Sequence, residues 1–130
     1  MRQNATVAVG FRNKDFVILE DDFRAAGCDL RIATDDGSYG HHGLVIDLIS
    51  RCAPPIKIFM PCGPKVMLRA VTEFAKAHNI PCEISLEERM ACGIGACLGC
   101  AVELYDENGE TYMGHVCKDG PVFPAERVVF

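Results

Sequence analysis

Residues 92–100 read Cys-Gly-Ile-Gly-Ala-Cys-Leu-Gly-Cys, and this stretch decides how the C-terminal part of the chain folds. Four residues separate Cys92 from Cys97, two separate Cys97 from Cys100, and sixteen lie between Cys100 and Cys117. This arrangement is the plant-type pattern for a [2Fe–2S] cluster. Three thiolates must reach one small inorganic core from a single short loop, so the loop has to wrap around that core.

Glycines between the cysteines suit such a loop, because they accept a positive φ and let backbone N–H groups approach the sulfurs. Hydrogen bonds of that kind tune the potential of a metal centre. The loop glycines are Gly93, Gly95 and Gly99, and the apolar residues that can exclude water are Met90, Ile94, Ala96 and Leu98. Zinc is the main alternative, since four thiolates also suit it. Zinc sites usually pair two short Cys-x2-Cys knuckles, however, and this chain has one. A third interpretation is four unrelated buried thiols.

The composition is that of a globular domain. The 130 residues include 49% apolar and 24% charged side chains, which argues against disorder. The formal net charge of −5 argues against a dedicated binder of nucleic acid or of anionic membranes. No apolar run approaches the roughly 18 residues of a membrane span. The N-terminus does not resemble a signal peptide, so we expect a cytoplasmic protein whose eight cysteines serve as metal ligands or redox groups before disulfides.

Before the cysteine stretch, strand-like and helix-like segments alternate, which indicates an α/β fold with a parallel sheet and right-handed crossovers. The expected strands are residues 5–9, 29–34, 56–60 and 83–86, and the expected helices are residues 13–26, 43–52 and 64–78. Asn13 is expected to cap the first helix and Gly27 to end it. A hairpin is expected around a turn at residues 106–109. The sequence therefore predicts an incomplete nucleotide-binding sheet at residues 1–89, followed by a small β-rich [2Fe–2S] module at residues 90–130.

Two further motifs follow expected strands, at the edge where open α/β sheets bind ligands. They are Thr34, Asp35, Asp36 and Gly37 after one strand, and Cys62, Gly63 and Pro64 after another. The two carboxylates would suit ribose hydroxyls and repel a 2′-phosphate, although an Asp-Gly turn is also ordinary. The second motif opens a helix, where a backbone N–H can face a cofactor. Its alternative is simply a small residue before a helix.

Other polar and sulfur-bearing residues have plainer interpretations. His41 and His42 are read as a solvent-facing pair before a helix and not as metal ligands. The cysteines outside the motifs are read as packed thiols; they are Cys28, Cys52 and Cys82. Arg89 could offset the charge of a cluster, and a surface role suits it equally well.

Residues 86–100 and 115–123 closely resemble the electron-transfer subunit of NAD-dependent dihydroorotate dehydrogenase, in the iron–sulfur branch of the ferredoxin–NADP reductase superfamily. In that family a β-barrel binds FAD, an α/β domain binds NAD, and a C-terminal module carries [2Fe–2S]. The resemblance implies that the four ligands are Cys92, Cys97, Cys100 and Cys117. It also implies nucleotide contacts at Gly10 and Phe11 after the family's second strand, at Thr34, Asp35, Asp36 and Gly37 after the third, and at Cys62, Gly63 and Pro64 after the fourth.

The function that this resemblance implies is electron transfer in de novo pyrimidine biosynthesis. In the family, dihydroorotate is oxidised at an FMN in a separate catalytic subunit, electrons pass through [2Fe–2S] to FAD, and hydride goes to NAD⁺. The protein positions the carriers, and no side chain need act as acid or base, so the chain is not expected to be a complete oxidoreductase by itself. The alternatives are a ferredoxin-like carrier of another NAD(P)H reductase complex and a zinc-stabilised structural domain.

The family's FAD barrel does not appear among these residues, nor does the first strand of its nucleotide domain with the Gly-rich phosphate turn. We therefore expect FAD to belong to an N-terminal half that acts as a partner. Residues 5–9 and 56–60 are then sheet edges that another polypeptide covers. We expect NAD in preference to NADP, because Asp35 and Asp36 would face the ribose and Arg12 is the only basic residue nearby.

Overall fold

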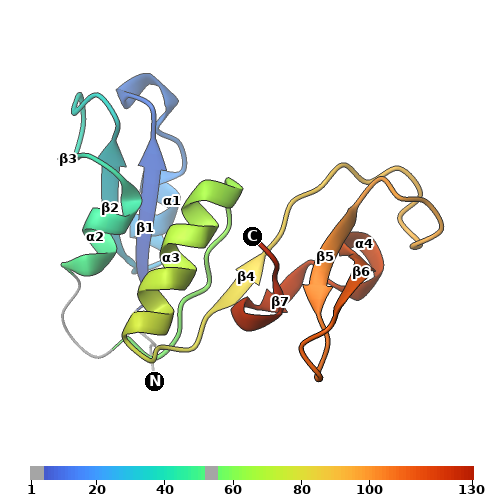
Figure 1. Cartoon of the computed structure of the whole chain (residues 1–130). Coiled ribbons are helices and arrows are strands. Elements are labelled where there is room, and N and C mark those ends of the chain that lie inside the picture. The colour runs from blue at the N-terminus through green and yellow to red at the C-terminus, as the bar shows by residue number, and fades with distance from the viewer. Residues whose placement is uncertain (1–4, 52–55) are drawn as a thin grey trace. The chain divides into compact units, whose positions relative to one another are not determined.

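The computed structural model describes residues 5–51 and 56–130 (Figure 1). The chain forms two compact units that divide between residues 54 and 55, and each is described by itself. The boundary expected between residues 89 and 90 separates parts by function, lies within the second unit and stays a prediction. The predictions for Cys52 and for the helix end at that residue fall outside the described residues. Within the described ranges, no helix has the length and apolar content that crossing a membrane requires.

A parallel sheet forms the centre of the first unit (Figure 1). Its strands are β1 (Thr6–Phe11), β2 (Asp29–Thr34) and β3 (His41–His42), in the order β1-β2-β3. The register of the first pair joins Thr6 to Asp29 and Phe11 to Thr34, and the two strands that the sequence predicts there are confirmed. The sequence does not predict β3, because two residues are too few to give an alternating pattern.

The prediction of a single helix over residues 13–26 is wrong. The structure has two short helices there, the 3-10 turn η1 (Lys14–Phe16) and α1 (Glu20–Ala25). Asn13 does act as a cap, since its side chain accepts the N–H of Asp15 at 2.9 Å. Leu19 then takes the left-handed conformation at φ 60°, which a continuous right-handed helix does not contain. Gly27, at φ 79°, confirms the expected stop.

The core of the first unit is small. α2 (Val45–Ser50), shorter than the expected helix, packs on β1 and β2. The buried side chains of this unit, within the described residues, are Ile32, Ala33, Thr34 and Leu48. Every residue of β1 is at least partly exposed, and β1 has a strand neighbour on one side only in the described part of the chain. This unit therefore leaves apolar surface uncovered.

The main helix of the second unit is α3 (Lys65–Ala77), which confirms the helix expected over residues 64–78. Pro64 stands just before its first turn, where a missing N–H costs nothing. The buried face is made of residues three and four apart, which are Leu68, Val71 and Ala75, each 1% exposed. This face anchors the helix in the core of the unit.

Residues 56–60, expected as a full strand, do not form one. They contain a single parallel bridge, between Phe59 and Cys82, beside which Phe59 accepts the N–H of Glu83 at 2.9 Å. Pro61 follows directly and has no N–H to continue the ladder. The apolar run is therefore extended but paired only at one point.

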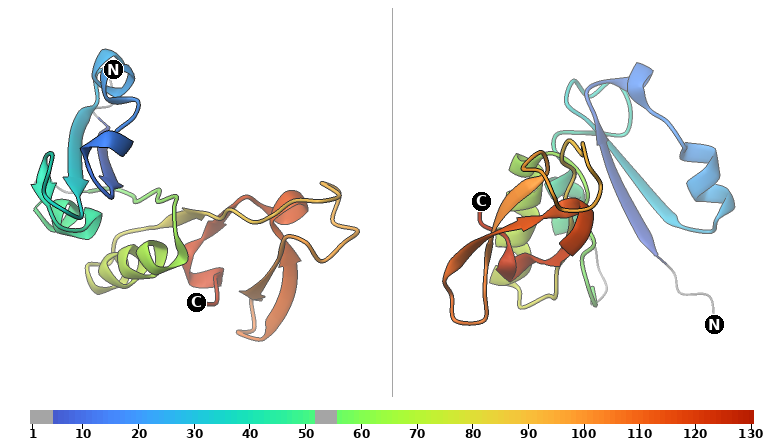
Figure 2. Two further views of the ribbon diagram at one scale, coloured as in Figure 1. Left: turned by 90° about the horizontal axis from the view of Figure 1, so that it is seen from above. Right: turned by 90° about the vertical axis from the view of Figure 1, so that its right-hand side faces the viewer.

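Two short antiparallel sheets complete the second unit. β4 (Glu83–Ser85) pairs with β7 (Val122–Pro124), β5 (Ala101–Tyr105) pairs with β6 (Thr111–His115), and the short helices are α4 (Val116–Asp119) and η2 (Ala125–Arg127). α3 lies on one side of β4 and the β5–β6 hairpin on the other (Figure 1, Figure 2). The hairpin turn falls at the expected residues 106–109, where Asp106 accepts the N–H of Asn108 at 2.8 Å. Ile84, Leu104 and Val116 are each 0% exposed, so this unit has a closed core.

Candidate metal centre

The cysteine loop, residues 90–100, contains neither helix nor strand and leads directly into β5. Gly93 and Gly95 adopt φ values of 70° and 76°, which is the left-handed conformation that the glycines were expected to supply. Ile94 and Leu98 are 73% and 80% exposed. Within this chain these apolar side chains are therefore surface residues and do not form a water-excluding shell.

The β5–β6 hairpin brings the last two cysteines together. Ala101 is opposite His115 in the register, so Cys100, directly before Ala101, and Cys117, two residues after His115, meet at the open end of the hairpin. The backbone N–H of Cys117 lies 3.5 Å from the Sγ of Cys100, and the N–H of Val116 donates to the carbonyl of Cys100 at 3.1 Å. Cys100 is buried, and this burial fixes one end of the loop against the core.

Cys92 and Cys97 form a second pair within the loop itself. The Ala96 N–H lies 3.3 Å from the Sγ of Cys92, and the Gly99 N–H lies 3.4 Å from the Sγ of Cys97. Backbone N–H groups, that of Ile94 first, hold the pKa of Cys92 at about 6, and a hydrogen bond from the Cys97 thiol adds to this effect. The loop backbone thus favours a thiolate at Cys92.

The Cys117 thiol responds to a different neighbour. Its hydrogen bond with the Cys100 thiol is the main cause that raises its pKa, and the N–H of Gly95 acts in the opposite direction. The thiols are therefore arranged as two pairs, Cys92 with Cys97 and Cys100 with Cys117.

Two thiol pairs, with a backbone N–H group directed at each of the four sulfurs, fit a two-iron core in which each iron takes two of the four cysteines. In residues 5–51 and 56–130, no three Cys, His, Asp or Glu side chains converge closely enough to hold one metal ion. The paired arrangement suits a dinuclear core, and metal analysis distinguishes that core from a single zinc ion.

The nucleotide-binding residues expected in the first unit meet at one edge of its parallel sheet. Gly10 pairs with Ala33 and Phe11 with Thr34, and the turn after β2 folds back, with the N–H of Asp35 donating to Phe11 O at 3.0 Å. Gly37, at φ 71°, closes that turn. The structure thus brings this group of expected residues together.

Thr34 and Asp36 have structural partners in that turn. Thr34 is 0% exposed, and its hydroxyl donates to the carbonyl of Tyr39 at 2.7 Å and accepts the N–H of Tyr39 at 3.1 Å. Asp36 accepts the hydroxyl of Ser38 at 2.6 Å and its N–H at 2.9 Å, and these bonds lower the pKa of the carboxyl. Asp35 is exposed and makes no such side-chain bond among the described residues. Of the two carboxylates, Asp35 is the one available to a ligand.

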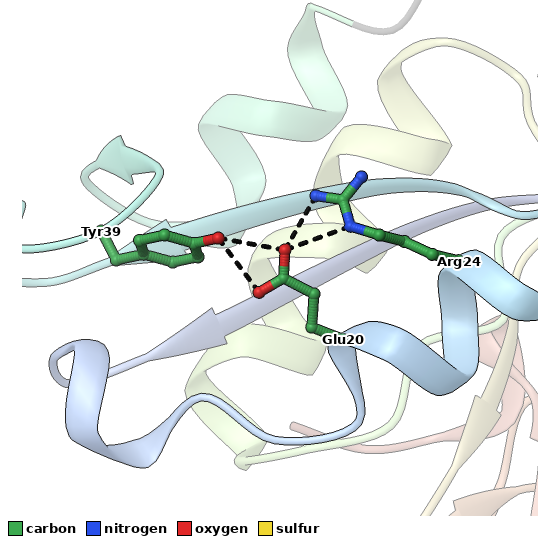
Figure 3. A network of polar contacts seen from close by, with 3 residues as sticks. All are labelled: Glu20, Arg24 and Tyr39. Carbon is green, nitrogen blue, oxygen red and sulfur yellow. Dashed lines mark hydrogen bonds and ion pairs between the residues drawn. The ribbon is translucent and has the colours of Figure 1, made fainter.

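A polar network that the sequence reasoning missed ties this turn to α1 (Figure 3). The Tyr39 hydroxyl donates to the Glu20 carboxylate at 3.0 Å, and Arg24 donates to the same carboxylate at 2.8 Å. Both contacts lower the pKa of the Glu20 carboxyl, and the contact with Arg24 has the larger effect. The spacing of Glu20 and Arg24 by four residues is a signal that could have revealed half of the network. Nothing in the sequence indicates the contribution of Tyr39.

Cys62, Gly63 and Pro64 belong to the second unit and precede α3. Cys62 is exposed and bridges to Ser85 of β4. Gly63 has φ 151°, and a Cβ there would lie 2.9 Å from the Cε of Met67. The backbone conformation and the neighbouring Met67 side chain therefore favour glycine here, independently of any contact with a cofactor.

The structure also shows the burial of the cysteines, histidines and arginine that the sequence does not assign to a site. Cys82 is buried, and burial raises the pKa of its thiol, which confirms a packed thiol; Cys28 is half-buried. His42 is exposed, whereas His41 is half-buried with its Nε2 3.8 Å from Asp47. Arg89 is exposed beside the cysteine loop.

Residues 87–129 match the family model described as the iron–sulfur cluster binding domain of dihydroorotate dehydrogenase B. The electron transfer subunit of dihydroorotate dehydrogenase B (NAD(+)) from Caldanaerobacter subterraneus subsp. tengcongensis is 43% identical over 128 residues, which cover 98% of this chain and 50% of that protein. The subunit of the same name from Bacillus caldolyticus is 45% identical over 121 residues, which cover 93% of this chain and 45% of that protein. The chain thus spans about half the length of these curated relatives.

A solved structure of an NADH-dependent reduced ferredoxin–NADP oxidoreductase, described in the context of flavin-based electron bifurcation, has a similar fold. The TM-score is 0.75 at 31% sequence identity, and the match covers 97% of this chain and 44% of the other. The match therefore spans both units of this chain within a larger protein of known structure.

Proposed function

We propose that the chain carries electrons for an enzyme of the dihydroorotate dehydrogenase B kind, on the premise that residues 87–129 match the model of that enzyme's iron–sulfur cluster binding domain. The proposed role is transfer between a flavin-containing dihydroorotate dehydrogenase catalytic subunit and NAD, in pyrimidine biosynthesis and in the cytoplasm. The relatives named as its electron transfer subunit, about twice as long, support the proposal.

The observation that carries the proposal is the pairing of the four thiols. Cys92 with Cys97 and Cys100 with Cys117 would hold the two irons of a [2Fe–2S] cluster, which supplies one-electron transfer when bound. Backbone N–H groups at Ala96 and Gly99 point at ligand sulfurs. They favour the thiolate form of the ligands and fix the loop around them, while the buried Cys100 anchors it to the core.

NAD would contact the first unit at the edge formed by Gly10, Phe11 and the turn at residues 34–37. The exposed carboxylate of Asp35 suits ribose hydroxyls and repels the 2′-phosphate of NADP. Thr34 holds the turn through Tyr39, and its position in that turn places it beside the proposed nucleotide contacts. Cys62, Gly63 and Pro64 would offer backbone N–H and carbonyl groups to a nicotinamide or flavin, with FAD itself held by the half of the relatives that this chain does not match.

That remaining half is also proposed to complete the sheet. β1 has one strand neighbour in the described residues, and its free edge carries unpaired backbone groups, which invite pairing with another chain. Adding the FAD-binding half of a relative to this chain should raise the melting temperature of the first unit. A first unit that melts at the same temperature with and without that half would contradict this part of the proposal.

Metal analysis tests the cluster directly. Anaerobically prepared protein should contain two irons and two acid-labile sulfides per chain, as a [2Fe–2S] centre requires. Replacing any one of the four ligand cysteines by Ser should weaken or abolish iron binding, and Cys28→Ser is the control that should not. One zinc per chain without labile sulfide would replace this proposal with a zinc-stabilised structural domain.

Nucleotide kinetics test the second part. Combined with an FAD-binding half, the wild-type chain should show a higher kcat/KM with NADH than with NADPH, and Asp35→Asn should reduce that preference. An intact cluster with no detectable nucleotide binding would instead indicate a ferredoxin-like carrier.

A further inference from the structure

The side chain of Lys118 packs across the cysteine loop at Gly95. A Cβ placed on Gly95 would lie 2.8 Å from the Cδ and 3.2 Å from the Cβ of Lys118. The aliphatic stem of the lysine therefore lies against the bare α-carbon of the glycine, as long cationic side chains do on apolar surface. Gly93 has nearly the same φ but has no atom within 4 Å of such a Cβ, so the contact is specific to Gly95.

The backbone on both sides of this contact is held in place. Lys118 lies in α4, between Val116, which is 0% exposed, and Asp119, whose carboxylate accepts the N–H of His115 at 2.7 Å. The N–H of Gly95 is directed at the sulfur of Cys117. α4 and the cysteine loop are thus joined directly beside the lysine stem.

The ammonium group of Lys118 is not neutralised by a neighbour. Within residues 5–51 and 56–130, no carboxylate lies within ion-pair distance of it. Glu88, before the cysteine loop in the sequence, is paired with Lys65 at 2.8 Å, and the Asp119 carboxylate is engaged by a backbone N–H. The charge of Lys118 is therefore available to the site that its stem covers.

We propose that Lys118 is a positioning residue for electron transfer, which holds a positive charge over the cysteine loop and raises the reduction potential of the centre bound there. The inference rests on the proposed function, since it needs a [2Fe–2S] cluster on the four cysteines. Four thiolates and two sulfides outweigh the charge of two ferric ions, so the site is net negative. One added electron reduces a ferric to a ferrous ion, breaks no bond and increases the negative charge, which a nearby cation stabilises.

The test compares midpoint potentials of the cluster-loaded full chain, measured by anaerobic titration with dithionite and followed by electron paramagnetic resonance of the reduced state. Lys118→Gln keeps most of the stem and removes the charge, and Lys118→Arg keeps the charge. Lys76→Gln removes a charge from the last turn of α3, which lies on the other side of β4 from the cysteine loop (Figure 1, Figure 2).

Lys118→Gln should lower the potential, with the equilibrium constant for reduction falling roughly two- to fivefold, the size typical of an exposed charge interaction. Lys118→Arg should restore the wild-type value, and Lys76→Gln should leave it unchanged. High salt should shrink the difference, because the lysine is exposed and salt screens its charge. A merely structural role would give no dependence on salt and no rescue by arginine.

A matched glycine pair tests the packing. Gly93→Ala and Gly95→Ala impose the same left-handed strain, but only the second places a methyl group against Lys118. Gly95→Ala should lower the potential more than Gly93→Ala, and combining it with Lys118→Gln should add little. Equal potentials for Lys118→Gln and Lys76→Gln, in proteins with full iron and sulfide, would overturn the inference and leave the proposed function standing. A wild-type chain that holds no two-iron centre would overturn both.

Discussion

Leu104 belongs to the core that supports the cysteine loop. Truncating it should destabilise the chain far more than truncating an apolar residue of the loop itself. Leu104 is 0% exposed on β5, and a Cβ on Gly114 of the facing strand would lie 2.5 Å from its Cδ1. It also bridges to Val128. Leu104→Ala removes three carbons from this packed position. At about 0.8 kcal/mol for each, the transfer term is about 2.4 kcal/mol, and the cavity brings the total to about 3–5 kcal/mol.

Leu98→Ala is the matched control, because it removes the same three carbons from a side chain that is 80% exposed in the cysteine loop. It should change stability by less than about 0.5 kcal/mol. Urea unfolding of the reduced, cluster-free chains, followed by far-UV circular dichroism, measures both. With a slope of about 1.5 kcal/mol/M, Leu104→Ala should lower the unfolding midpoint by about 2 M or more. It should also speed the loss of iron from the loaded protein, since β5 begins directly after Cys100. Equal midpoints for the two variants would refute the assignment of Leu104 to the core that supports the loop.

Three further outcomes concern the turns and the first unit. Thr34→Val removes the hydroxyl that satisfies both backbone groups of Tyr39 and should cost about 1–3 kcal/mol of stability, measured by thermal unfolding; an unchanged melting temperature would contradict the role of Thr34 as an anchor. The pKa of Asp106 is held below its ordinary value by the backbone N–H groups of Glu110 and Asn108, so its stabilising contribution is present above that ordinary value and is lost as the pH falls through the lowered one. The melting-temperature difference between wild type and Asp106→Asn should accordingly shrink on acidification, and a difference that grows would count against it. Arg24→Met should raise the pKa of Glu20 toward its ordinary value, because Arg24 is the main cause of its lowering; a carboxyl NMR titration of Glu20 that is unaffected by the change would dismiss that cause.

Sequence patterns predict α3 and two helix boundaries correctly, because local residue types determine them. The apolar spacing of Leu68, Val71 and Ala75 predicts α3, and Pro64 and Gly27 mark helix boundaries where the structure has them. The cysteine spacing predicts which residues converge. It does not reveal that Cys100 lies beside Cys117, because that pairing depends on the register of β5 with β6.

The wrong predictions lie where tertiary contacts decide. Residues 13–26 contain enough apolar residues for one helix, but the left-handed Leu19 divides them. Residues 56–60 read as a strand, yet they find one bridge partner in the described structure. The contact of Lys118 with Gly95 is invisible in the sequence, since the two residues are brought together only by the turn after β6.

The hairpin that joins Cys100 to Cys117 also sets an order of events during folding. β-Hairpins form within about 1–10 µs, because their strands are neighbours along the chain. The pairing of β4 with β7, from Glu83 to Pro124, must instead close a much longer loop. This closure costs more chain entropy before any contact between the strands forms. Cys100 and Cys117 are thus expected to come together early and by local contacts. On the proposed ligand set, half of the iron site is expected to form before β4 pairs with β7.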